Sequence, residues 1–370
     1  MYPDRRGVLG RGIHEIDTPA LIIDYRQLRE NIARMADYFR PLPADLRPHA
    51  KTHKCPQVAA LQVAAGALGV TCAKLGEAEA MATAGIESIL IANQLVGERT
   101  TDRLARLVRY TGAQVMPAVD APDRVAELER AAIRWDVTLP AVVEVDIGLR
   151  RGGARSPGAA LQLVRSLSAS DHLTFEGLIA YEGHALREKD LHARAEVVTR
   201  SMERFMEAVI YVEEAGIEVP MVSAGSTGTY TVTGNYPGLT EVEAGSYVFM
   251  DANYLATVEG FPPALHLLTT VTTRHEEGLL VTDMGLKTAS VDQVPPIITD
   301  PVGITIAHLS EEHSQLLLES EEAKQLRVGD RLKAIVGHCC TTVNLHDRYY
   351  VCEDGVVVDV WPITGRGRSQ

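Results

Sequence analysis

The fold is decided by residues 88–147, which read SILIANQLVGERTTDRLARLVRYTGAQVMPAVDAPDRVAELERAAIRWDVTLPAVVEVDI. Short apolar runs alternate here with amphipathic stretches, and the successive segments are 88–94, 98–110, 113–119, 122–134 and 141–147. Short apolar runs bounded by turns indicate buried strands, whereas apolar residues that recur near every 3.6 positions indicate helices. The stretch therefore predicts consecutive strand–helix units, which are typical of a parallel sheet covered by helices.

The same alternation continues on both sides of this stretch. Further strand candidates are 46–51, 67–73, 173–181, 221–224 and 239–249, and further helix candidates are 26–40, 76–85, 158–169 and 189–215. When the first apolar run, 20–24, is set aside, about eight strand–helix units remain, which predicts an α/β fold of the (β/α)8 TIM-type barrel class. An open doubly wound sheet has a similar local pattern and stays as the alternative.

The pattern changes after about residue 255. Segments such as 265–285 and 348–365 alternate apolar and polar residues between turns rich in Gly, Asp and Glu. Alternation with a period of two predicts strands with one buried face. The sequence therefore predicts a C-terminal, mostly antiparallel β domain.

The composition limits the classes of function. The chain has 36 Lys and Arg against 49 Asp and Glu, a formal net charge of −13, which argues against a nucleic-acid partner. No run approaches the roughly 20 apolar residues of a membrane span, and no secretory signal is recognisable, so we expect no membrane association. The five cysteines are odd in number, which argues against a disulfide framework and for a reducing, cytoplasmic location.

Ligand-binding residues of a barrel lie at the carboxyl ends of its strands. The first barrel strand ends in RPHAKTHK at 47–54, where the amine of Lys51 could act as a Schiff-base nucleophile. The alternative is that this segment is only a solvated loop. The sixth strand ends with Tyr181 and His184, an aromatic ring and an imidazole that are open to the same two interpretations.

Two other strand ends suit anions. The fifth is followed by Gly148-Leu149-Arg150-Arg151-Gly152, where a guanidinium could bind an anion or a phenolate oxygen. The seventh is followed by SAGSTGTY at 223–230, whose backbone could form a phosphate-binding nest. An ordinary surface loop and a flexible turn are the respective alternatives. The predicted phosphate donors are Ser226, Thr227 and Gly228, with Gly245, Ser246 and Tyr247 after the eighth strand.

The β domain contains His338-Cys339-Cys340. If this segment is extended, His338 and Cys340 share one face, because side chains alternate along a strand. An imidazole and a thiolate would form an open site for a metal such as Zn²⁺. The alternative is a buried histidine beside two core cysteines.

Taken together, these residues resemble the D-threonine aldolase / D-serine dehydratase family of fold-type III pyridoxal-phosphate enzymes, which are relatives of alanine racemase. The motifs that carry the resemblance are RPHAKTHK at 47–54, SAGSTGTY at 223–230 and GHCCTTVNLHD at 337–347. The resemblance implies a pyridoxal-phosphate barrel at 18–255 and a β domain at 256–370 that also includes 1–17. It further implies a homodimer.

The resemblance also implies roles for individual residues. Lys51 would bind pyridoxal phosphate covalently, and Arg151 would lie near its phenolic oxygen. The turn at 225–228 would hold the phosphate, and His338 with Cys340 would bind a divalent metal. Tyr181 is a predicted cofactor contact and His184 a predicted catalytic residue.

The implied activity is that of a lyase on β-hydroxy-D-amino acids such as D-serine, D-threonine or 3-hydroxy-D-aspartate. Dehydration would yield a 2-oxo acid and ammonia, whereas aldol cleavage would yield glycine, or a substituted glycine, and an aldehyde. Family aldolases tend to have aspartate at the position of Cys340 and dehydratases cysteine, so the sequence favours a dehydratase with Zn²⁺ rather than Mn²⁺ or Mg²⁺. A non-catalytic pyridoxal-phosphate carrier and an amino-acid racemase are further alternatives. The residues after about 255 and the metal-ligand pair argue against the carrier, and a racemase would need a second base.

Overall fold

The structure, a computed structural model, describes residues 7–275 and 278–370 and divides the chain into two compact units. The barrel unit contains Arg34–Lys51, Pro56–Gly245 and Arg368–Gln370, and the β unit contains Met1–Ala33, Thr52–Cys55 and Ser246–Gly367. The parts of the predicted β domain at 1–6 and 276–277 lie outside the described residues.

Eight parallel strands form the sheet of the barrel unit, in the order β2-β9-β8-β7-β6-β5-β4-β3. Their bounds are β2 (Asp45–Leu46), β3 (Val70–Cys72), β4 (Ser88–Gln94), β5 (Gln114–Val119), β6 (Leu139–Val145), β7 (Leu173–Ala180), β8 (Met221–Ala224) and β9 (Glu241–Val242). A parallel bridge between His49 and Thr71 joins the segments that continue β2 and adjoin β3, so the two ends of the sheet meet. The predicted (β/α)8 barrel is confirmed, and the open sheet is excluded.

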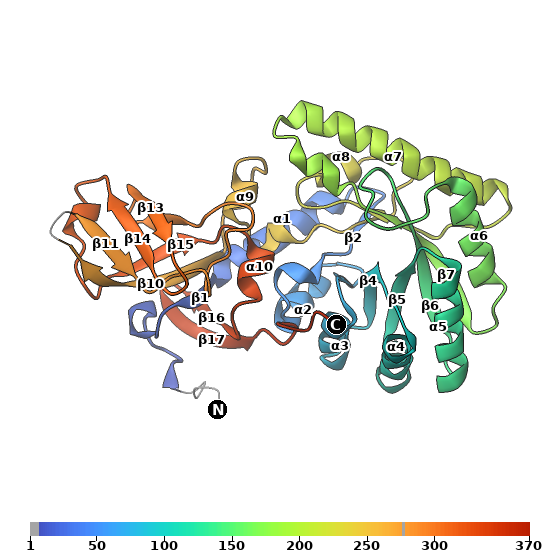
Figure 1. The fold of residues 1–370 in the computed structure, drawn as a ribbon, viewed down its shortest axis with the longest axis horizontal. Coiled ribbons are helices and arrows are strands. Elements are labelled where there is room, and N and C mark those ends of the chain that lie inside the picture. Colours follow the sequence, from blue (N-terminus) through green and yellow to red (C-terminus); the bar gives the residue numbers. More distant parts are fainter. Residues whose placement is uncertain (1–6, 276–277) are drawn as a thin grey trace. The chain divides into compact units, whose positions relative to one another are not determined.

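Helices surround these strands (Figure 1). Their bounds are α2 (Pro56–Ala64), α3 (Leu75–Thr83), α4 (Glu98–Thr111), α5 (Pro122–Trp135), α6 (Pro157–Ser168), α7 (Leu191–Glu214) and α8 (Tyr230–Thr233), and α1 (Tyr25–Phe39) is divided between the units after Ala33. Local chemistry explains their ends. Helices α5 and α6 begin with proline, whose fixed φ suits a first helical position, and the Ser156 side chain caps α6. Gly112 ends α4 in the left-handed conformation, at φ +71.

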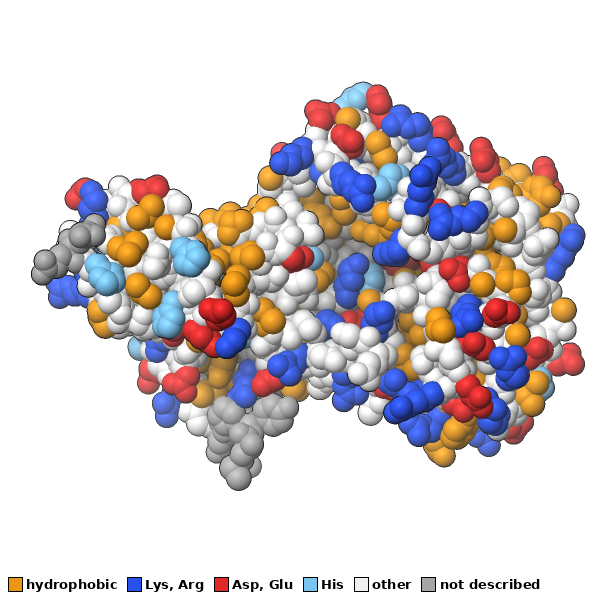
Figure 2. Space-filling view, viewed as in Figure 1, with side chains coloured by type: hydrophobic (Ala, Val, Ile, Leu, Met, Phe, Trp, Pro, Cys, Tyr) orange, Lys and Arg blue, Asp and Glu red, His pale blue; other side chains and the backbone are white. Residues whose placement is uncertain are grey.

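The interior of the barrel is filled by side chains from five consecutive strands. This buried cluster consists of Leu90, Met116, Ala118, Val142, Ile179 and Met221. Gly177 in β7 is needed for this packing, because a Cβ atom there would lie 2.1 Å from the carbonyl oxygen of Met221. Acidic and basic side chains are interspersed along the visible face of α7 (Figure 2).

The β unit is built on a mostly antiparallel sheet, as the sequence predicts. Its bounds are β1 (Ala20–Asp24), β10 (Leu265–Arg274), β11 (Leu279–Thr282), β12 (Ile297–Asp300), β13 (Ile304–Leu309), β14 (Ser314–Leu318), β15 (Arg331–Ile335), β16 (Arg348–Glu353) and β17 (Val356–Pro362). Strand β1 is the apolar run that the barrel pattern leaves over, and it lies between β10 and β16. Its pairing with β16 is the one parallel pair among the described strands of this sheet.

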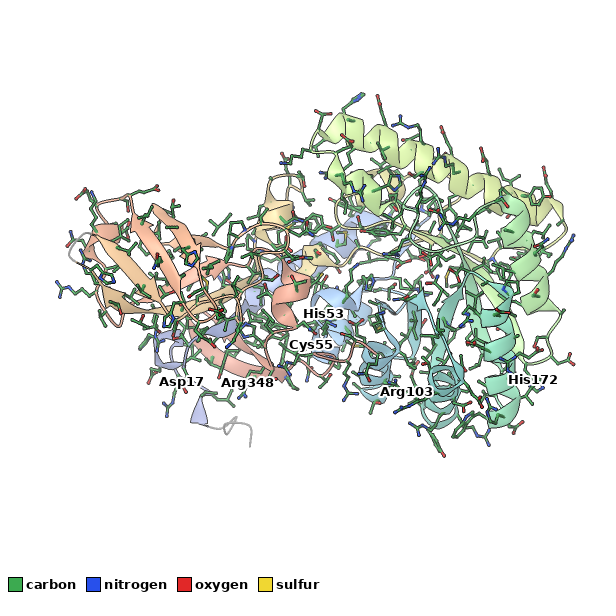
Figure 3. All side chains as sticks on the ribbon, in the orientation of Figure 1. Asp17, His53, Cys55, Arg103, His172 and Arg348 are labelled. Carbon is green, nitrogen blue, oxygen red and sulfur yellow. The ribbon has the colours of Figure 1, made fainter. Side chains whose placement is uncertain are left out.

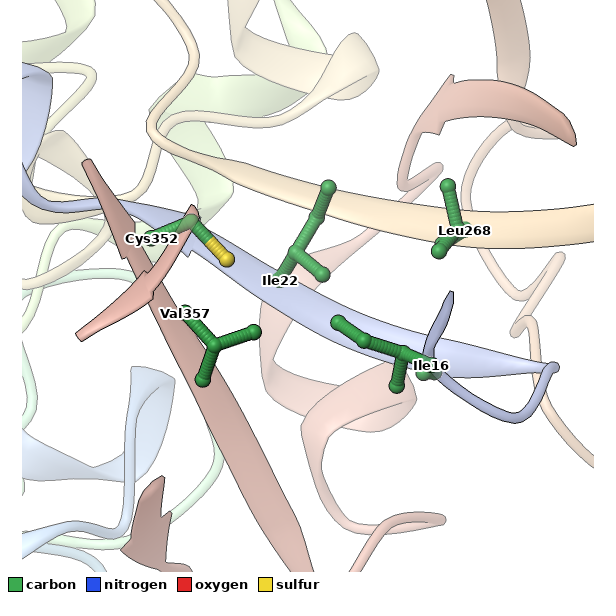
Figure 4. Close-up of a cluster of buried hydrophobic side chains, with 6 residues drawn as sticks. Ile16, Ile22, Leu268, Cys352 and Val357 are labelled. Carbon is green, nitrogen blue, oxygen red and sulfur yellow. The ribbon is translucent and has the colours of Figure 1, made fainter. Parts of the chain in front are cut away.

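The core of the β unit forms where β1 meets its neighbours. Ile22 packs there with Ile16, Leu268, Cys352 and Val357 (Figure 4). The remaining helical elements are short: α9 (Ala252–Leu255), α10 (Cys339–Val343), η2 (Ile13–Glu15), η3 (Ala50–Thr52), η4 (Gly183–Arg187), η5 (Ser246–Val248) and η6 (Ala323–Gln325). None of the helices in the described part of the chain is long and apolar enough to cross a membrane.

Candidate active site

Lys51 lies in a single 3-10 turn, η3, that follows the first barrel strand. The sequence predicts a strand over 46–51, but β2 ends at Leu46 and the chain then turns. The Lys51 ammonium lies 5.8 Å from the centre of the Tyr181 ring, and the guanidinium carbon of Arg151 lies 5.5 Å from the same centre. The barrel therefore brings together three predicted residues from the ends of three strands, with two cations on one aromatic ring.

Arg151 is also oriented by a carboxylate. Glu144, near the end of β6, lies 3.7 Å from the Arg151 guanidinium and accepts a hydrogen bond from the Gln94 amide. Burial raises the pKa of Glu144 above its usual range, against the Gln94 hydrogen bond and the Arg151 charge, which lower it. The guanidinium is thus held at the mouth of the barrel beside both a ring and an acid.

The Gly/Ser/Thr turn after β8 is held by a buried acid, Glu182. The Glu182 carboxylate accepts hydrogen bonds from the Gly225 N–H at 3.2 Å and from the hydroxyls of Thr229 at 2.5 Å and Thr233 at 2.8 Å. Within the described residues, the N–H of Gly228 donates to no protein acceptor. A rigid turn with a backbone donor to spare fits a phosphate group.

A second buried acid, Glu243, follows β9. It accepts a hydrogen bond from the Ser223 hydroxyl at 3.1 Å. Burial and, to a smaller extent, the charge of Glu241 raise the pKa of the Glu243 carboxyl. The Ser223 hydrogen bond and the charges of Lys51 and Arg47 lower it. The resulting pKa is about 7. Arg47 is itself bound to Glu241 by two hydrogen bonds of 2.7 and 2.8 Å. The Glu243 carboxyl therefore titrates near neutrality, and the positive charge of Lys51 acts on it electrostatically.

His184 has other surroundings. Its Nε2 lies 3.3 Å from the Ser201 hydroxyl of α7, and a Cβ atom at Gly148 would lie 3.0 Å from its ring. Burial is the main reason that its pKa is lowered. Among the described contacts of His184 there is none with Lys51 or Tyr181.

The residues that follow Lys51, Thr52–Cys55, belong to the β unit. The Cys55 N–H donates to Nδ1 of His53 at 3.1 Å, and the two side chains lie just before α2 (Figure 3). The Tyr349 hydroxyl donates to the His53 carbonyl at 2.7 Å. This hydrogen bond connects the end of RPHAKTHK to β16.

Ser246 and Tyr247, the other predicted phosphate donors, lie in η5 of the β unit, whereas Gly245 is the last residue of its barrel-unit segment. The Ser246 hydroxyl lies 3.5 Å from that of Thr52. The Tyr247 side chain is completely buried, and its ring packs at 5.7 Å from that of Phe261.

The segment of His338 and Cys340 is helical rather than extended. Cys339–Val343 forms α10, and His338 is its N-cap. The two side chains are nevertheless hydrogen-bonded, because the first helical turn brings Cys340 back to His338. Cys339 is completely buried and donates to the Met250 carbonyl, whereas the Cys340 sulfur is half-buried and lies 3.6 Å from the Thr52 hydroxyl.

A carboxylate supports the histidine. Nδ1 of His338 lies 2.8 Å from Oδ2 of Asp292, whose Oδ1 accepts hydrogen bonds of 2.6 Å from the hydroxyls of Ser290 and Thr341. Burial would raise the pKa of Asp292, but these hydrogen bonds outweigh it and lower the pKa to about 2. Burial would likewise lower the pKa of His338, but the hydrogen bond and charge interaction with Cys340 and the hydrogen bond to Asp292 raise it to about 9.

The donor set of this segment suits a metal that accepts nitrogen and sulfur. In the described parts of the chain there is no group of three or more His, Cys, Asp or Glu side chains that could hold an ion. A metal on His338 and Cys340 would therefore keep coordination positions for other ligands, which is typical of a catalytic rather than a structural site.

Four carboxylates near these clusters have no role in the sequence interpretation: Glu144, Glu182, Glu243 and Asp292. The three glutamates lie at or just beyond the carboxyl ends of barrel strands. Since functional residues of barrels lie at these ends, their positions in the sequence could have identified them as candidates. Asp292 lies in a loop between β11 and β12, and no pattern in the sequence connects it with His338.

Comparison with known families accounts for both units. Residues 23–253 match the family model described as alanine racemase, N-terminal domain, and residues 264–352 match the model described as putative serine dehydratase domain. The 3-hydroxy-D-aspartate aldolase of Paracoccus denitrificans (strain Pd 1222) is 35% identical over 365 residues, which are 96% of this chain and 93% of that relative.

Solved structures match nearly the full length of the chain. The D-threonine aldolase from Filomicrobium marinum matches with a TM-score of 0.93 and 32% identity, covering 97% of this chain and 98% of that one. The D-threo-3-hydroxyaspartate dehydratase from Delftia sp. HT23 matches with a TM-score of 0.87 and 26% identity, covering 95% and 98%. The chain therefore belongs to the D-threonine aldolase / D-serine dehydratase family of alanine racemase-like, fold-type III pyridoxal-phosphate enzymes.

Proposed function

We propose that this protein is a pyridoxal-phosphate- and divalent-metal-dependent lyase that acts on β-hydroxy-D-amino acids. The observation that carries the proposal is the convergence of Lys51 and Arg151 on the ring of Tyr181, at the strand ends of a barrel that belongs to this family. A lysine and an arginine at the mouth of a barrel are the groups that a phosphorylated aldehyde cofactor requires.

The cofactor would be held by residues of known surroundings. Lys51 would bind it covalently, with Arg151 and Tyr181 beside its ring. The turn from Ser226 through Thr227 to Gly228, which Glu182 holds in place, would bind the phosphate. Gly245, Ser246 and Tyr247 are further proposed phosphate donors. Bound pyridoxal phosphate would supply an electron sink for negative charge that develops at Cα of the substrate.

Lys51 is the proposed base. Its amine would take the proton from Cα, and the cation–π contact with Tyr181 would restrict the directions in which that amine can point. Glu243 titrates near neutrality and would stabilise positive charge on Lys51 when it is ionised. His184 stays a proposed catalytic residue, although its Nδ1 is buried and has no hydrogen-bond partner in the described structure.

His338 and Cys340 would hold the divalent metal. Imidazole and thiolate ligands favour Zn²⁺ over the harder Mn²⁺ and Mg²⁺, and the metal would supply Lewis-acid chemistry towards the β-hydroxyl group. Solved variants of a D-threo-3-hydroxyaspartate dehydratase support this assignment. They replace a histidine and, two positions later, a cysteine by alanine, and the cysteine variant is described in a metal-free form. The spacing is that of His338 and Cys340.

Dehydration is the reaction that Cys340 favours. In dehydration the Cα proton and the β-hydroxide leave, and hydrolysis then yields a 2-oxo acid and ammonia. Similarity favours a second candidate, because the Paracoccus and Filomicrobium aldolases exceed the Delftia dehydratase in identity to this chain. In aldol cleavage the β-hydroxyl proton is removed and the Cα–Cβ bond breaks, which yields glycine, or a substituted glycine, and an aldehyde.

The test is incubation of the full-length protein, pyridoxal phosphate and Zn²⁺ or Mn²⁺ with D-threonine and, separately, with 3-hydroxy-D-aspartate. We expect 2-oxobutyrate from D-threonine, whereas glycine with acetaldehyde would establish the aldolase. L-threonine is the matched control and should not react. A protein that binds no pyridoxal phosphate, or that forms none of these products, would contradict the proposal.

We also propose that the protein is a homodimer, as the family resemblance implies. Light scattering of the holoenzyme should yield a mass of twice 40.2 kDa, and a mass of one chain at working concentrations would contradict it.

A further inference from the structure

The carboxylate of Asp292 accepts three hydrogen bonds. Oδ1 accepts from the hydroxyls of Ser290 and Thr341, each at 2.6 Å, and Oδ2 lies 2.8 Å from Nδ1 of His338. A carboxylate oxygen can only accept, so the proton of this last hydrogen bond is on Nδ1. In the neutral imidazole that binds a metal, the contact therefore selects the tautomer with its proton on Nδ1.

The loop that carries Asp292 is itself held against α10. The Ser290 N–H donates to the Thr342 hydroxyl at 3.1 Å, and Nε2 of His346 lies 2.8 Å from the Thr288 carbonyl. The Asp292 side chain is only partly exposed. Asp292 is therefore fixed on a support formed by the same helix that His338 caps.

A neutral imidazole with its proton on Nδ1 has its lone pair on Nε2. The His338 side chain also hydrogen-bonds that of Cys340, so the ring contacts both an acid and the thiol. Metal-binding histidines commonly donate their second ring nitrogen to a carboxylate, which fixes the ring and increases its basicity.

Asp292 is an unsuitable third metal ligand. Three of the roughly four lone-pair positions of its carboxylate already accept hydrogen bonds, so coordination by Oδ1 would displace a hydroxyl. The other acid near this segment, Asp251, is occupied in the same way, because it accepts hydrogen bonds from the backbone N–H groups of Cys339 at 2.9 Å and Tyr254 at 3.1 Å. Both acids support the segment.

We infer that Asp292 is a positioning residue for the metal site, and that it holds His338 in the tautomer and orientation in which Nε2 binds the metal. The inference rests on the proposed function, because it takes His338 and Cys340 as the ligands. In this assignment Asp292 is not itself a ligand and acts through the histidine.

The experiment measures metal affinity and coordination on the full-length holoenzyme after its metal has been removed by a chelator. Co²⁺ is titrated by its visible ligand-field absorption, and Zn²⁺ by competition with a chromophoric chelator. We expect Asp292→Ala to bind both ions about 10- to 100-fold more weakly, with a changed Co²⁺ spectrum. Asp292→Asn retains an oxygen that can accept from Nδ1 and should lose less affinity than the alanine variant.

Two controls separate positioning from a general loss of structure. Ser290→Ala removes one donor to Asp292 without touching His338 and should bind Co²⁺ nearly as the wild type does. The absorption of bound pyridoxal phosphate and the thermal unfolding midpoint should be unchanged in the Asp292 variants that lose metal affinity.

His338→Ala distinguishes the two ways in which the idea can fail. If His338→Ala loses metal and Asp292→Ala retains wild-type affinity and the wild-type Co²⁺ spectrum, the inference is overturned and the proposed metal ligand stands. If both variants bind metal as the wild type does, the proposed metal site is wrong and the inference falls with it.

Discussion

The two candidate clusters of this protein are assembled in different ways. In the barrel unit Lys51, Arg151 and Tyr181 follow three different strands and meet because the sheet closes. In the β unit His338 and Cys340 are two residues apart and meet within the first turn of α10. The barrel cluster therefore depends on the whole unit, whereas the His338–Cys340 pair depends on one turn and its supports.

The supports differ as well. In the barrel unit the supporting groups are buried acids, Glu182 and Glu243, which follow β7 and β9 on either side of β8. In the β unit the support is a partly exposed loop aspartate, Asp292. The comparison predicts that loss of a supporting acid in the barrel unit weakens cofactor binding or alters the pH dependence of stability. Changes at α10 should alter metal binding and leave cofactor binding intact.

The largest expected effect is that of Lys51→Ala. Loss of the amine removes the covalent link to the cofactor and the proposed base, and proton transfer by a positioned base contributes about 10²- to 10⁴-fold. We expect turnover of D-threonine to fall within or beyond that range and borohydride to trap no cofactor on the protein. Lys74→Ala, an exposed lysine at the start of α3, is the control and should behave as the wild type. A coloured, borohydride-reactive Lys51→Ala protein would exclude Lys51 as the attachment site.

The next effect is a change of metal and product in Cys340→Asp. A carboxylate is a harder ligand than a thiolate, so the preference should move from Zn²⁺ towards Mn²⁺ or Mg²⁺. We expect the ratio of glycine to 2-oxobutyrate formed from D-threonine to rise, with cofactor absorption unchanged. Cys339→Ala alters the buried neighbour and should keep the wild-type metal preference. An unchanged preference in Cys340→Asp would mean that Cys340 is not a ligand.

A smaller effect is expected for Glu182→Ala. Three hydrogen bonds from the turn after β8 end on this carboxylate, and a hydrogen bond to a charged group contributes about 1.5–3 kcal/mol. Pyridoxal-phosphate affinity, measured by equilibrium dialysis, should fall by about 10-fold or more. Glu182→Gln, which keeps one acceptor oxygen, should lose less, and metal affinity at α10 should not change. Equal cofactor affinity in all three proteins would show that the turn does not need this acid.

The smallest effect concerns pH and Glu243. Its pKa is raised in the folded protein from 4.5 to about 7, so between these values the folded state binds more protons than the unfolded state. This contribution makes the free energy of unfolding decrease as pH rises through that window. In Glu243→Gln the decrease should be smaller, as measured by urea unfolding at several pH values. Glu207→Gln, on the exposed face of α7, is the control. A wild-type pH profile in Glu243→Gln would show that this carboxyl does not titrate there.

Much of the fold could be predicted because its patterns are local. Apolar runs and amphipathic stretches predict the eight barrel units, and the alternation after residue 255 predicts the antiparallel sheet. Details that depend on long-range packing could not be predicted. The segment 46–51 continues as a strand by composition, yet β2 ends at Leu46 and Lys51 lies in a 3-10 turn. His338-Cys339-Cys340 suits a strand equally well, but it starts α10.

By itself, the sequence determined the order of the elements, the family, and the residue types at the ends of the barrel strands, because these follow from local periodicity and short motifs. Only the tertiary structure decided that Glu182 holds the turn after β8, that Glu243 lies in the field of Lys51, and that Asp292 orients His338. The physical reason is distance along the chain. A carboxylate acquires its role from the donors and charges that folding brings to it, and those partners lie on other strands, helices and loops.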